Sequence, residues 1–377
     1  PVTEPAWCEA WIRTEVGTEA EAEQRFRRLL QELGIEATEG TLQFPERTVI
    51  QIMASERQLV ELVGSSDDVA EFRLAKATAA FWLNLPNEDQ AQAVEDVLSR
   101  LEAIDSDIAI CILDTGINNG HPLLQPVLAP EDCHTARAEW GTHDQNGHGT
   151  LMAGVAAFGD LHDVLASGNR IRVPYVLESA KLLHSPGTEN PHELYGFLTA
   201  QGISYAEIQA PQRNRIICMA ISSVDDRDAG RPSSWSGEID ALASGALDDT
   251  RRLIIVAAGN TAEPDEWQDF PERTLTNEVH DPGQAWNALT VGAWTQKTNV
   301  QDPAYAGYEP IAPFGCISPF TSTSLTWEDK WPAKPDVLME GGNAASEAGG
   351  MCADLDDLAL VSAHYEPRLR HFAAHNM

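Results

Sequence analysis

Three polar residues of this chain carry side chains that a hydrolytic site needs. Asp114 follows the apolar run "IAICIL", His148 opens the run "HGTLMAGVAA", and Asn260 follows "LIIVAAG". A carboxylate can orient an imidazole, the imidazole can take a nucleophile's proton, and a carboxamide can stabilise an oxyanion. Together these residue types make up most of a serine hydrolase site. Each one alone is weaker evidence, because Asp and Asn are common turn residues.

The glycines beside His148 suggest that this residue has more than a packing role. In "DQNGHGTLMAG", residues 144–154, Gly147 and Gly149 flank the histidine. Glycine has no Cβ, so backbone and substrate can approach such a position closely. The apolar residues that follow predict a buried helix that starts here. We therefore expect His148 on the first turn of that helix, with a core or capping histidine as the alternative.

The elements that must position these residues alternate along the chain. The runs that we interpret as buried parallel strands are "AICIL", "RVPYVL", "RIICMAI" and "LIIVAAG". Between them lie the helical patterns "TLMAGVAAFG", "ELYGFLTAQGISYAEIQA" and "WSGEIDALASGALDD". This alternation predicts the α/β class, with a doubly wound and mostly parallel sheet over residues 105–377. Ligands bind at the carboxyl ends of the strands in such sheets, which is where Asp114 and Asn260 fall.

The chain before this domain has a different pattern. Residues 1–83 show strand and helix signals in the order β-α-β-β-α-β, which predicts a ferredoxin-like α+β domain. Residues 84–104 form a connector, most of it a polar helix with Val94, Val97 and Leu101 on one side. We therefore expect two domains joined by this helical connector.

The sequence motifs around the three polar residues support a family resemblance. "DTGINNGHPLL", "NGHGTLMAGVAA" and "VAAGN" occur in this order, and they closely resemble motifs of the subtilisin-like serine peptidases, the subtilases. The resemblance covers residues 105–377 and matches the subtilisin order Asp…His…Ser. It implies a subtilisin-like fold and a serine endopeptidase with a Ser-His-Asp triad. By the same match, Asp114 orients the imidazole, His148 is the general base and Asn260 stabilises the oxyanion.

Two weaker matches extend the resemblance. "RIICMAISS" is similar to the strand that lines the subtilase cleft, where the peptide main chain pairs in β fashion, and its end departs from the usual Met-Ser-Leu-Gly. The residues implied to bind substrate are Met219, Ala220, Ile221 and Ser222. Residues 1–83 resemble the ferredoxin-like propeptide that many subtilases carry as a folding aid and inhibitor. Another small α+β module is the alternative for that domain.

The nucleophile of the family has no counterpart in this sequence. A subtilase serine stands in Gly-Thr-Ser-x-Ala, and "GTS" does not occur among the 377 residues. "HFAAHNM" resembles the segment directly ahead of that motif, so we expect the serine just beyond Met377. The chain alone is then inactive. The alternatives are a second chain or C-terminal fragment that supplies the serine, and a catalytically inactive pseudopeptidase that binds peptides. Among the other serines, Ser222 and Ser223 follow the cleft strand, and Ser362 falls where the family often has a strand shortly before the nucleophile. The serines in a loop without the strand–turn–helix context of a nucleophile are Ser318, Ser322 and Ser324.

Other hydrolase classes fit the sequence less well. An aspartic peptidase needs two carboxylates that share a proton, and only one "DTG" occurs here. A metal hydrolase could use His143, Asp144 and His148, but the loop lacks the i, i+4 histidine pair with a glutamate between. The reaction needs no cofactor. The acidic stretches 225–228 and 247–249 could hold structural Ca²⁺, and surface turns are the alternative for both.

The charge of the chain limits its partners. Acidic residues number 58 and basic residues 25, for a formal net charge of −33. Such a protein is repelled by nucleic acid and by anionic membrane surfaces. The sequence also shows neither a transmembrane run nor a secretory signal, and its six cysteines are scattered without a C-x-x-C pair. We therefore expect a cytoplasmic protein that acts on peptide or protein substrates, with an ATPase as a candidate partner.

Overall fold

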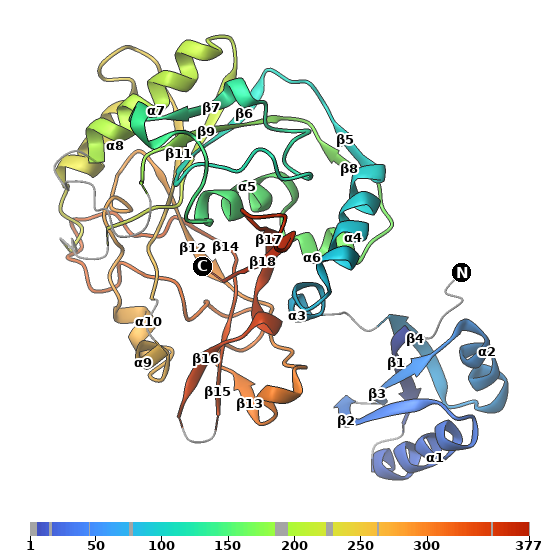
Figure 1. The fold of residues 1–377 in the computed structure, drawn as a ribbon. Coiled ribbons are helices and arrows are strands. Elements are labelled where there is room, and N and C mark those ends of the chain that lie inside the picture. Colours follow the sequence, from blue (N-terminus) through green and yellow to red (C-terminus); the bar gives the residue numbers. More distant parts are fainter. Residues whose placement is uncertain are drawn as a thin grey trace. The chain divides into compact units, whose positions relative to one another are not determined.

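The chain folds as two compact units, Pro1–Ala77 and Thr78–Met377 (Figure 1). In the computed structural model, the residues described are 6–14, 17–44, 46–74, 78–184, 195–223, 229–261, 264–347 and 350–376. The short helix α3 (Ala79–Leu83) lies in the second unit and packs in one of its hydrophobic clusters. None of the described helices is long and apolar enough to cross a membrane.

The first unit is a four-stranded antiparallel sheet with two helices. Its strands have the order β2-β3-β1-β4. Helix α1 buries Ala22, Phe26 and Leu30, which are spaced by four residues and so share one helix face. This order is the ferredoxin-like arrangement that the sequence predicts. The elements are β1 (Ala6–Arg13), α1 (Glu19–Glu32), β2 (Glu36–Phe44), β3 (Arg47–Ala54), α2 (Glu56–Ser65) and β4 (Val69–Leu74).

The second unit is built on a seven-stranded parallel sheet with the order β14-β12-β11-β10-β6-β9-β7. This sheet confirms the predicted α/β class. One predicted strand was wrong in its extent: "RVPYVL" forms β8 (Ile171–Val173) and β9, because Pro174 has no N–H for a ladder bond. The strands of the sheet are β6 (Ile108–Asp114), β7 (Cys133–Thr135), β9 (Val176–Lys181), β10 (Asn214–Met219), β11 (Leu253–Ala257), β12 (Leu289–Trp294) and β14 (Val337–Glu340).

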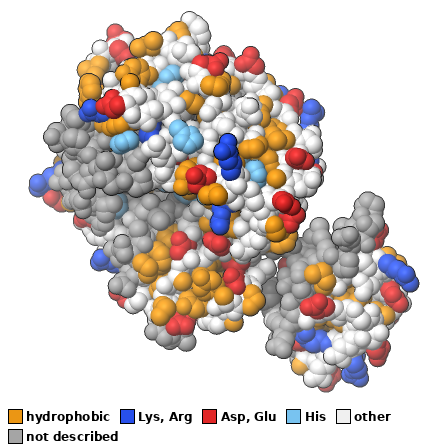
Figure 2. All heavy atoms as spheres, in the orientation of Figure 1, with side chains coloured by type: hydrophobic (Ala, Val, Ile, Leu, Met, Phe, Trp, Pro, Cys, Tyr) orange, Lys and Arg blue, Asp and Glu red, His pale blue; other side chains and the backbone are white. Residues whose placement is uncertain are grey.

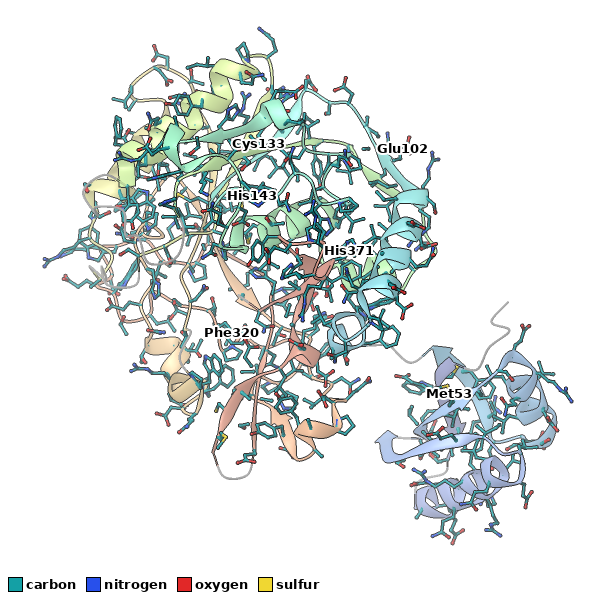
Figure 3. The ribbon with its side chains drawn as sticks, viewed as in Figure 1. Met53, Glu102, Cys133, His143, Phe320 and His371 are labelled. Carbon is teal, nitrogen blue, oxygen red and sulfur yellow. The ribbon has the colours of Figure 1, made fainter. Side chains whose placement is uncertain are left out.

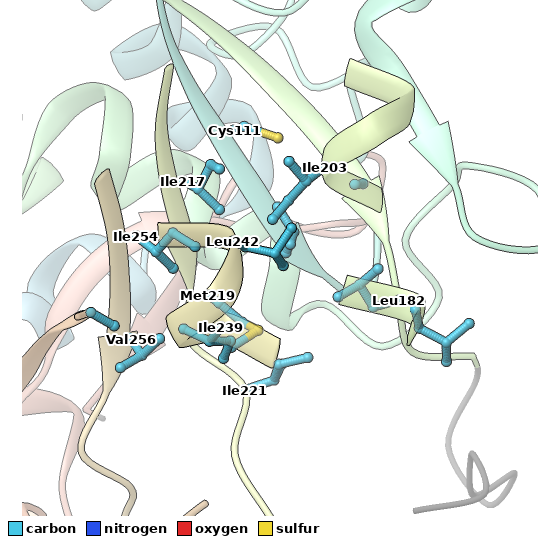
Figure 4. Close-up of a cluster of buried hydrophobic side chains, with 14 of the residues drawn as sticks. Cys111, Leu182, Ile203, Ile217, Met219, Ile221, Ile239, Leu242, Ile254 and Val256 are labelled. Carbon is cyan, nitrogen blue, oxygen red and sulfur yellow. The ribbon is translucent and has the colours of Figure 1, made fainter. Parts of the chain in front are cut away.

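Helices cover the two faces of this sheet unequally. On one face, α7 (Tyr195–Gln209) and α8 (Ser234–Ser244) pack on Ile217, Met219 and Val256 (Figure 4). On the other face, α5 (His148–Phe158) packs Ala153 and Ala157 in a cluster with Ile112 of β6. The inner strand β6, which ends in Asp114, is therefore packed on both faces.

Smaller elements surround the sheet. Helix α4 (Asn87–Arg100) contributes Val94 and Val97 to a buried cluster with Leu161 and Phe372, so the predicted polar helix is packed into the second unit. The acidic surface charge is spread out: Figure 2 shows acidic side chains over the visible face of this unit, with a few basic ones between them. The further elements are β5 (Leu101–Ala103), α6 (Leu161–Leu165), α9 (Pro264–Trp267), α10 (Glu272–Thr276), β13 (Tyr308–Pro310), β15 (Ala344–Glu347), β16 (Cys352–Asp354), β17 (Leu360–Ala363) and β18 (Phe372–His375).

Candidate active site

Asp114 lies at the carboxyl end of β6, an inner strand of the parallel sheet between β10 and β9. Its side chain is 1% exposed, and Oδ1 accepts a hydrogen bond from the backbone N–H of Thr115 at 2.7 Å. Its carbonyl oxygen accepts from the N–H of Leu182 at 2.8 Å, in the turn after β9. The carboxylate is thus held on a rigid strand end, the position at which parallel sheets bind ligands.

His148 stands on the first turn of α5, as the sequence predicts, and faces Asp114. Its Nδ1 lies 2.8 Å from Oδ1 and 2.9 Å from Oδ2 of Asp114. The flanking glycines make this approach possible. Gly147 has a φ of 103°, and a Cβ on Gly149 would lie 2.0 Å from the carbonyl oxygen of Gly116. A side chain at position 149 would push the helix away from the turn that follows β6, and one at position 147 would be strained by the backbone and would meet the ring of Tyr365.

The surroundings of His148 favour its protonated form. Burial lowers the pKa of His148, but the charge and hydrogen bond of Asp114 and the charge of Asp144 outweigh it, so that the pKa is raised. Because a carboxylate can only accept, Nδ1 carries the proton toward Asp114, and in the neutral ring Nε2 is then an acceptor. This pair can take a proton at Nε2 and stabilise the resulting charge.

Asn260 lies at the same edge of the sheet, three residues after the end of β11. It is half-buried and forms an isolated antiparallel bridge with Thr321. Among the described residues, its side-chain amide has no hydrogen-bond partner. The carboxamide is therefore free to donate to a ligand at the edge that also carries Asp114 and His148.

The predicted substrate-binding residues alternate in their exposure. Met219 and Ile221 are buried in the core beneath α8, whereas Ala220 and Ser222 are half-buried. The Ser222 hydroxyl lies 3.4 Å from Nδ1 of His280. Only the second pair of side chains can contact a ligand, because successive residues of an extended segment point to opposite sides.

None of the described serines is hydrogen-bonded to His148. Ser362 is buried on β17 and donates to the carbonyl oxygen of Leu151 at 2.6 Å, and Ser318 donates to that of Gly342. The neighbour of the imidazole is instead His375, with ring centroids 6.0 Å apart and planes at 71°. Burial and the charge of His148 lower the pKa of His375 to about 4.

The residues considered as metal ligands are occupied by other contacts where the structure describes them. Asp144 is fully buried and accepts five hydrogen bonds, so it does not fit a metal-ligand role. Figure 3 places His143 near α5, and its carbonyl oxygen accepts from Lys181. In the stretch 247–249, Asp248 pairs with Arg252 at 2.5 Å. The stretch 225–228 lies outside the described residues.

An Asp–His pair at the carboxyl edge of a parallel sheet defines a candidate hydrolase site, and comparison with known proteins gives its family. The model of the subtilase family, Peptidase S8, matches residues 105–377. The chain therefore belongs to the subtilase family of serine peptidases. This assignment confirms the resemblance that the three motifs indicate.

Comparison with solved structures gives a weak similarity to three proteases. An S41 psychrophilic protease is 21% identical, with 75% of this chain and 77% of that chain covered and a TM-score of 0.43. The epidermin leader peptide processing protease EpiP from Staphylococcus aureus is 14% identical, with 99% and 84% covered and a TM-score of 0.42. The nisin leader peptidase NisP from Lactococcus lactis is 14% identical, with 75% of each chain covered and a TM-score of 0.44. No curated protein matches this chain.

Proposed function

We propose that this chain carries the acid, the base and an oxyanion donor of a subtilisin-like serine endopeptidase. The observation that supports this function best is the contact of His148 Nδ1 with both carboxylate oxygens of buried Asp114, at 2.8 and 2.9 Å. This contact fixes the tautomer in which Nε2 accepts a proton. A lone packing histidine does not need such a partner.

In the proposed reaction, a serine hydroxyl attacks the carbonyl carbon of the scissile peptide bond and its proton moves to Nε2 of His148. Asp114 stabilises the imidazolium through Nδ1. Asn260 donates from its side-chain amide to the oxyanion. The imidazolium then protonates the leaving amine as the C–N bond breaks, and a water molecule hydrolyses the acyl-enzyme by the same steps in reverse order.

We place the serine in sequence that follows Met377. Two features of the described residues support this placement. β18 pairs with β17 and brings His375 beside His148. The carbonyl oxygen of the next residue, Asn376, accepts from the N–H of Gly342 at 3.1 Å, just after the edge strand β14. A segment that continues the chain after Asn376 therefore starts close to the imidazole of His148.

Apolar surface beside the site supports a helix in that following segment. The residues of α5 that point away from the buried clusters, Leu151 and Val155, are half-exposed although the helix is apolar on all sides. Helices of this kind are normally buried. On the sheet face opposite α7 and α8, Ile216, Ile255 and Val291 are also half-exposed. A helix packed against both surfaces would bury them.

A peptidase that is inactive in this chain alone is the second candidate. It is favoured by the observation that no described serine is hydrogen-bonded to His148. In that case a second chain supplies the serine, or the site binds peptides without cleaving them. We assign the N-terminal domain, residues 1–77 in the structure, the role of a propeptide that acts as a folding aid and inhibitor.

The experiment is peptide cleavage by protein made from the whole coding sequence, including everything after the codon of Met377, with only the first unit, residues 1–77, removed. We expect cleavage at internal peptide bonds, a loss on the order of 10⁶-fold in His148→Ala, and full activity in Asp163→Asn, a control at an exposed acid of α6. Folded protein that cleaves no peptide with or without an added second chain would contradict the endopeptidase and leave the peptide-binding candidate.

A further inference from the structure

We propose that Asp144 is the positioning residue of this site and sets the distance between Asp114 and His148. The proposal rests on the proposed function, because it concerns the general base of that reaction. Asp144 precedes His148 by four residues in a polar loop, yet its side chain is fully buried.

The carboxylate of Asp144 acts as the N-terminal cap of α5, whose own N-cap residue provides no side-chain hydrogen bond. Gly147, the N-cap residue, has no side chain. Oδ2 of Asp144 accepts from the backbone N–H of Thr150 at 2.9 Å and from its hydroxyl at 2.6 Å. Oδ1 accepts from the N–H groups of Asn146 and Gly147 at 2.9 and 2.8 Å. One carboxylate therefore satisfies donors of the helix start and of the loop before it, as a capping side chain does.

The same carboxylate ties α5 to the strand that carries Asp114. The hydroxyl of Thr115 donates to Oδ1 of Asp144 at 3.0 Å. That hydroxyl also accepts from the N–H of Gly149 at 2.9 Å. Thr115, the residue after Asp114, is therefore hydrogen-bonded both to Gly149, the residue after His148, and to Asp144. A shift of either element would change the distance between the carboxylate and the imidazole.

Asp144 also acts on His148 through its charge. The charged and titratable groups around the imidazole are Asp114 on β6, Asp144 in the loop and His375 on β18. Asp144 adds to the rise in the pKa of His148 that Asp114 causes. Its counter-charge is Lys181, whose Nζ donates to the carbonyl oxygen of His143 at 2.7 Å and whose own pKa is lowered by burial. The buried carboxylate therefore favours the imidazolium that forms during the reaction.

The test compares Asp144→Asn, Thr115→Val and Thr115→Ser with the exposed control Asp163→Asn, all in the present chain. NMR would follow the downfield Nδ1–H resonance of His148 and its titration, and the melting temperature would be measured in parallel. We expect Asp144→Asn to lower the pKa of His148 and weaken that resonance. Thr115→Val should weaken the resonance and Thr115→Ser should restore it, while the control stays like the parent. In the complete enzyme, Asp144→Asn should lower kcat by up to ~10²-fold.

A lower melting temperature with an unchanged titration and an unchanged Nδ1–H resonance would overturn the proposal, because it would show that Asp144 only stabilises the fold. If Asp144→Asn does not fold, the two Thr115 variants decide, since Thr115→Val keeps the shape of the side chain and removes only its hydroxyl. These readouts need no nucleophile. A failure to find peptidase activity would therefore contradict the proposed function without deciding the role of Asp144.

Discussion

At the scale of single residues, the site depends on one buried carboxylate that faces one half-exposed imidazole. The side chain of Asp114 is 1% exposed and that of His148 is 31% exposed. A buried charge is costly unless it is paired and hydrogen-bonded, and Asp114 meets both conditions through His148 and the N–H of Thr115. The imidazole edge that remains open to solvent is the edge that a substrate and a nucleophile can reach.

Asp114→Asn should remove the interaction that raises the pKa of His148. The raised pKa means that this pair stabilises the fold below the unfolded pKa of about 6.5, and that the contribution is lost as pH rises through the folded value. The variant should therefore titrate at lower pH than the parent. In the complete enzyme kcat should fall on the order of 10⁴-fold, because a carboxamide can hold the wrong tautomer. A titration of His148 equal to that of the parent would contradict this account.

Asn260→Ala tests the oxyanion donor. We expect kcat of the complete enzyme to fall roughly 10²- to 10³-fold with little change in KM, because the amide binds charge that develops only in the transition state. Steady-state kinetics on a peptide substrate measure both constants. A rise in KM with unchanged kcat would show instead that Asn260 binds the substrate in its ground state.

At the scale of elements, the sequence predicted the helices and strands whose apolar residues recur with a clear period. It missed features that depend on tertiary contacts. The start of α5 at His148 and the end of β6 at Asp114 follow from apolar runs that stop at polar residues. The division of "RVPYVL" between β8 and β9 was missed. The residues on both sides of Pro174 favour strand structure, and we gave this more weight than the missing N–H of the proline. Asp144 looked like a loop residue, because nothing local to "HDQNGH" shows that its carboxylate is buried.

The close approach of α5 to β17 provides a test at this scale. A Cβ on Gly154 would lie 2.2 Å from the Ser362 hydroxyl and 2.8 Å from the N–H nitrogen of Ala363. Gly154→Ala should therefore lower the free energy of unfolding by about 1–3 kcal/mol. The matched control is Gly237→Ala in α8, where a Cβ meets nothing within 4 Å, and this variant should be neutral or up to ~1 kcal/mol more stable. Equal effects in urea unfolding would contradict the packing argument.

At the scale of the whole molecule, the predicted α/β class and the ferredoxin-like first unit are confirmed, and buried histidines make the stability of the second unit depend on pH. His121 is fully buried, and its Nε2 lies 3.0 Å from the carbonyl oxygen of His371, which Figure 3 shows beside β17 and β18. Burial lowers the pKa of His121 to about 4. The neutral ring therefore helps to hold the strand pair that brings His375 to the site. Long-range contacts of this kind are not visible in a local sequence pattern.

Acidification should destabilise the second unit between pH 6.5 and 4. His121 takes up a proton in the unfolded chain below about 6.5 but not in the fold until about 4, so stability falls as pH falls through this window. The part of this loss that is due to His121 should be about 3 kcal/mol. Urea unfolding at several pH values measures it in the parent, in His121→Gln and in His143→Gln, a control at an exposed histidine. The same pH dependence in all three proteins would contradict the assignment.

The most direct test of the account is to find the serine. Protein made from the whole coding sequence, freed of residues 1–77, would be treated with a fluorophosphonate and digested, and the labelled residue would be identified by mass spectrometry. We predict one labelled serine, in sequence after Met377, and no labelling in His148→Ala. A labelled serine among residues 105–377, or labelling that persists without His148, would contradict the site described above.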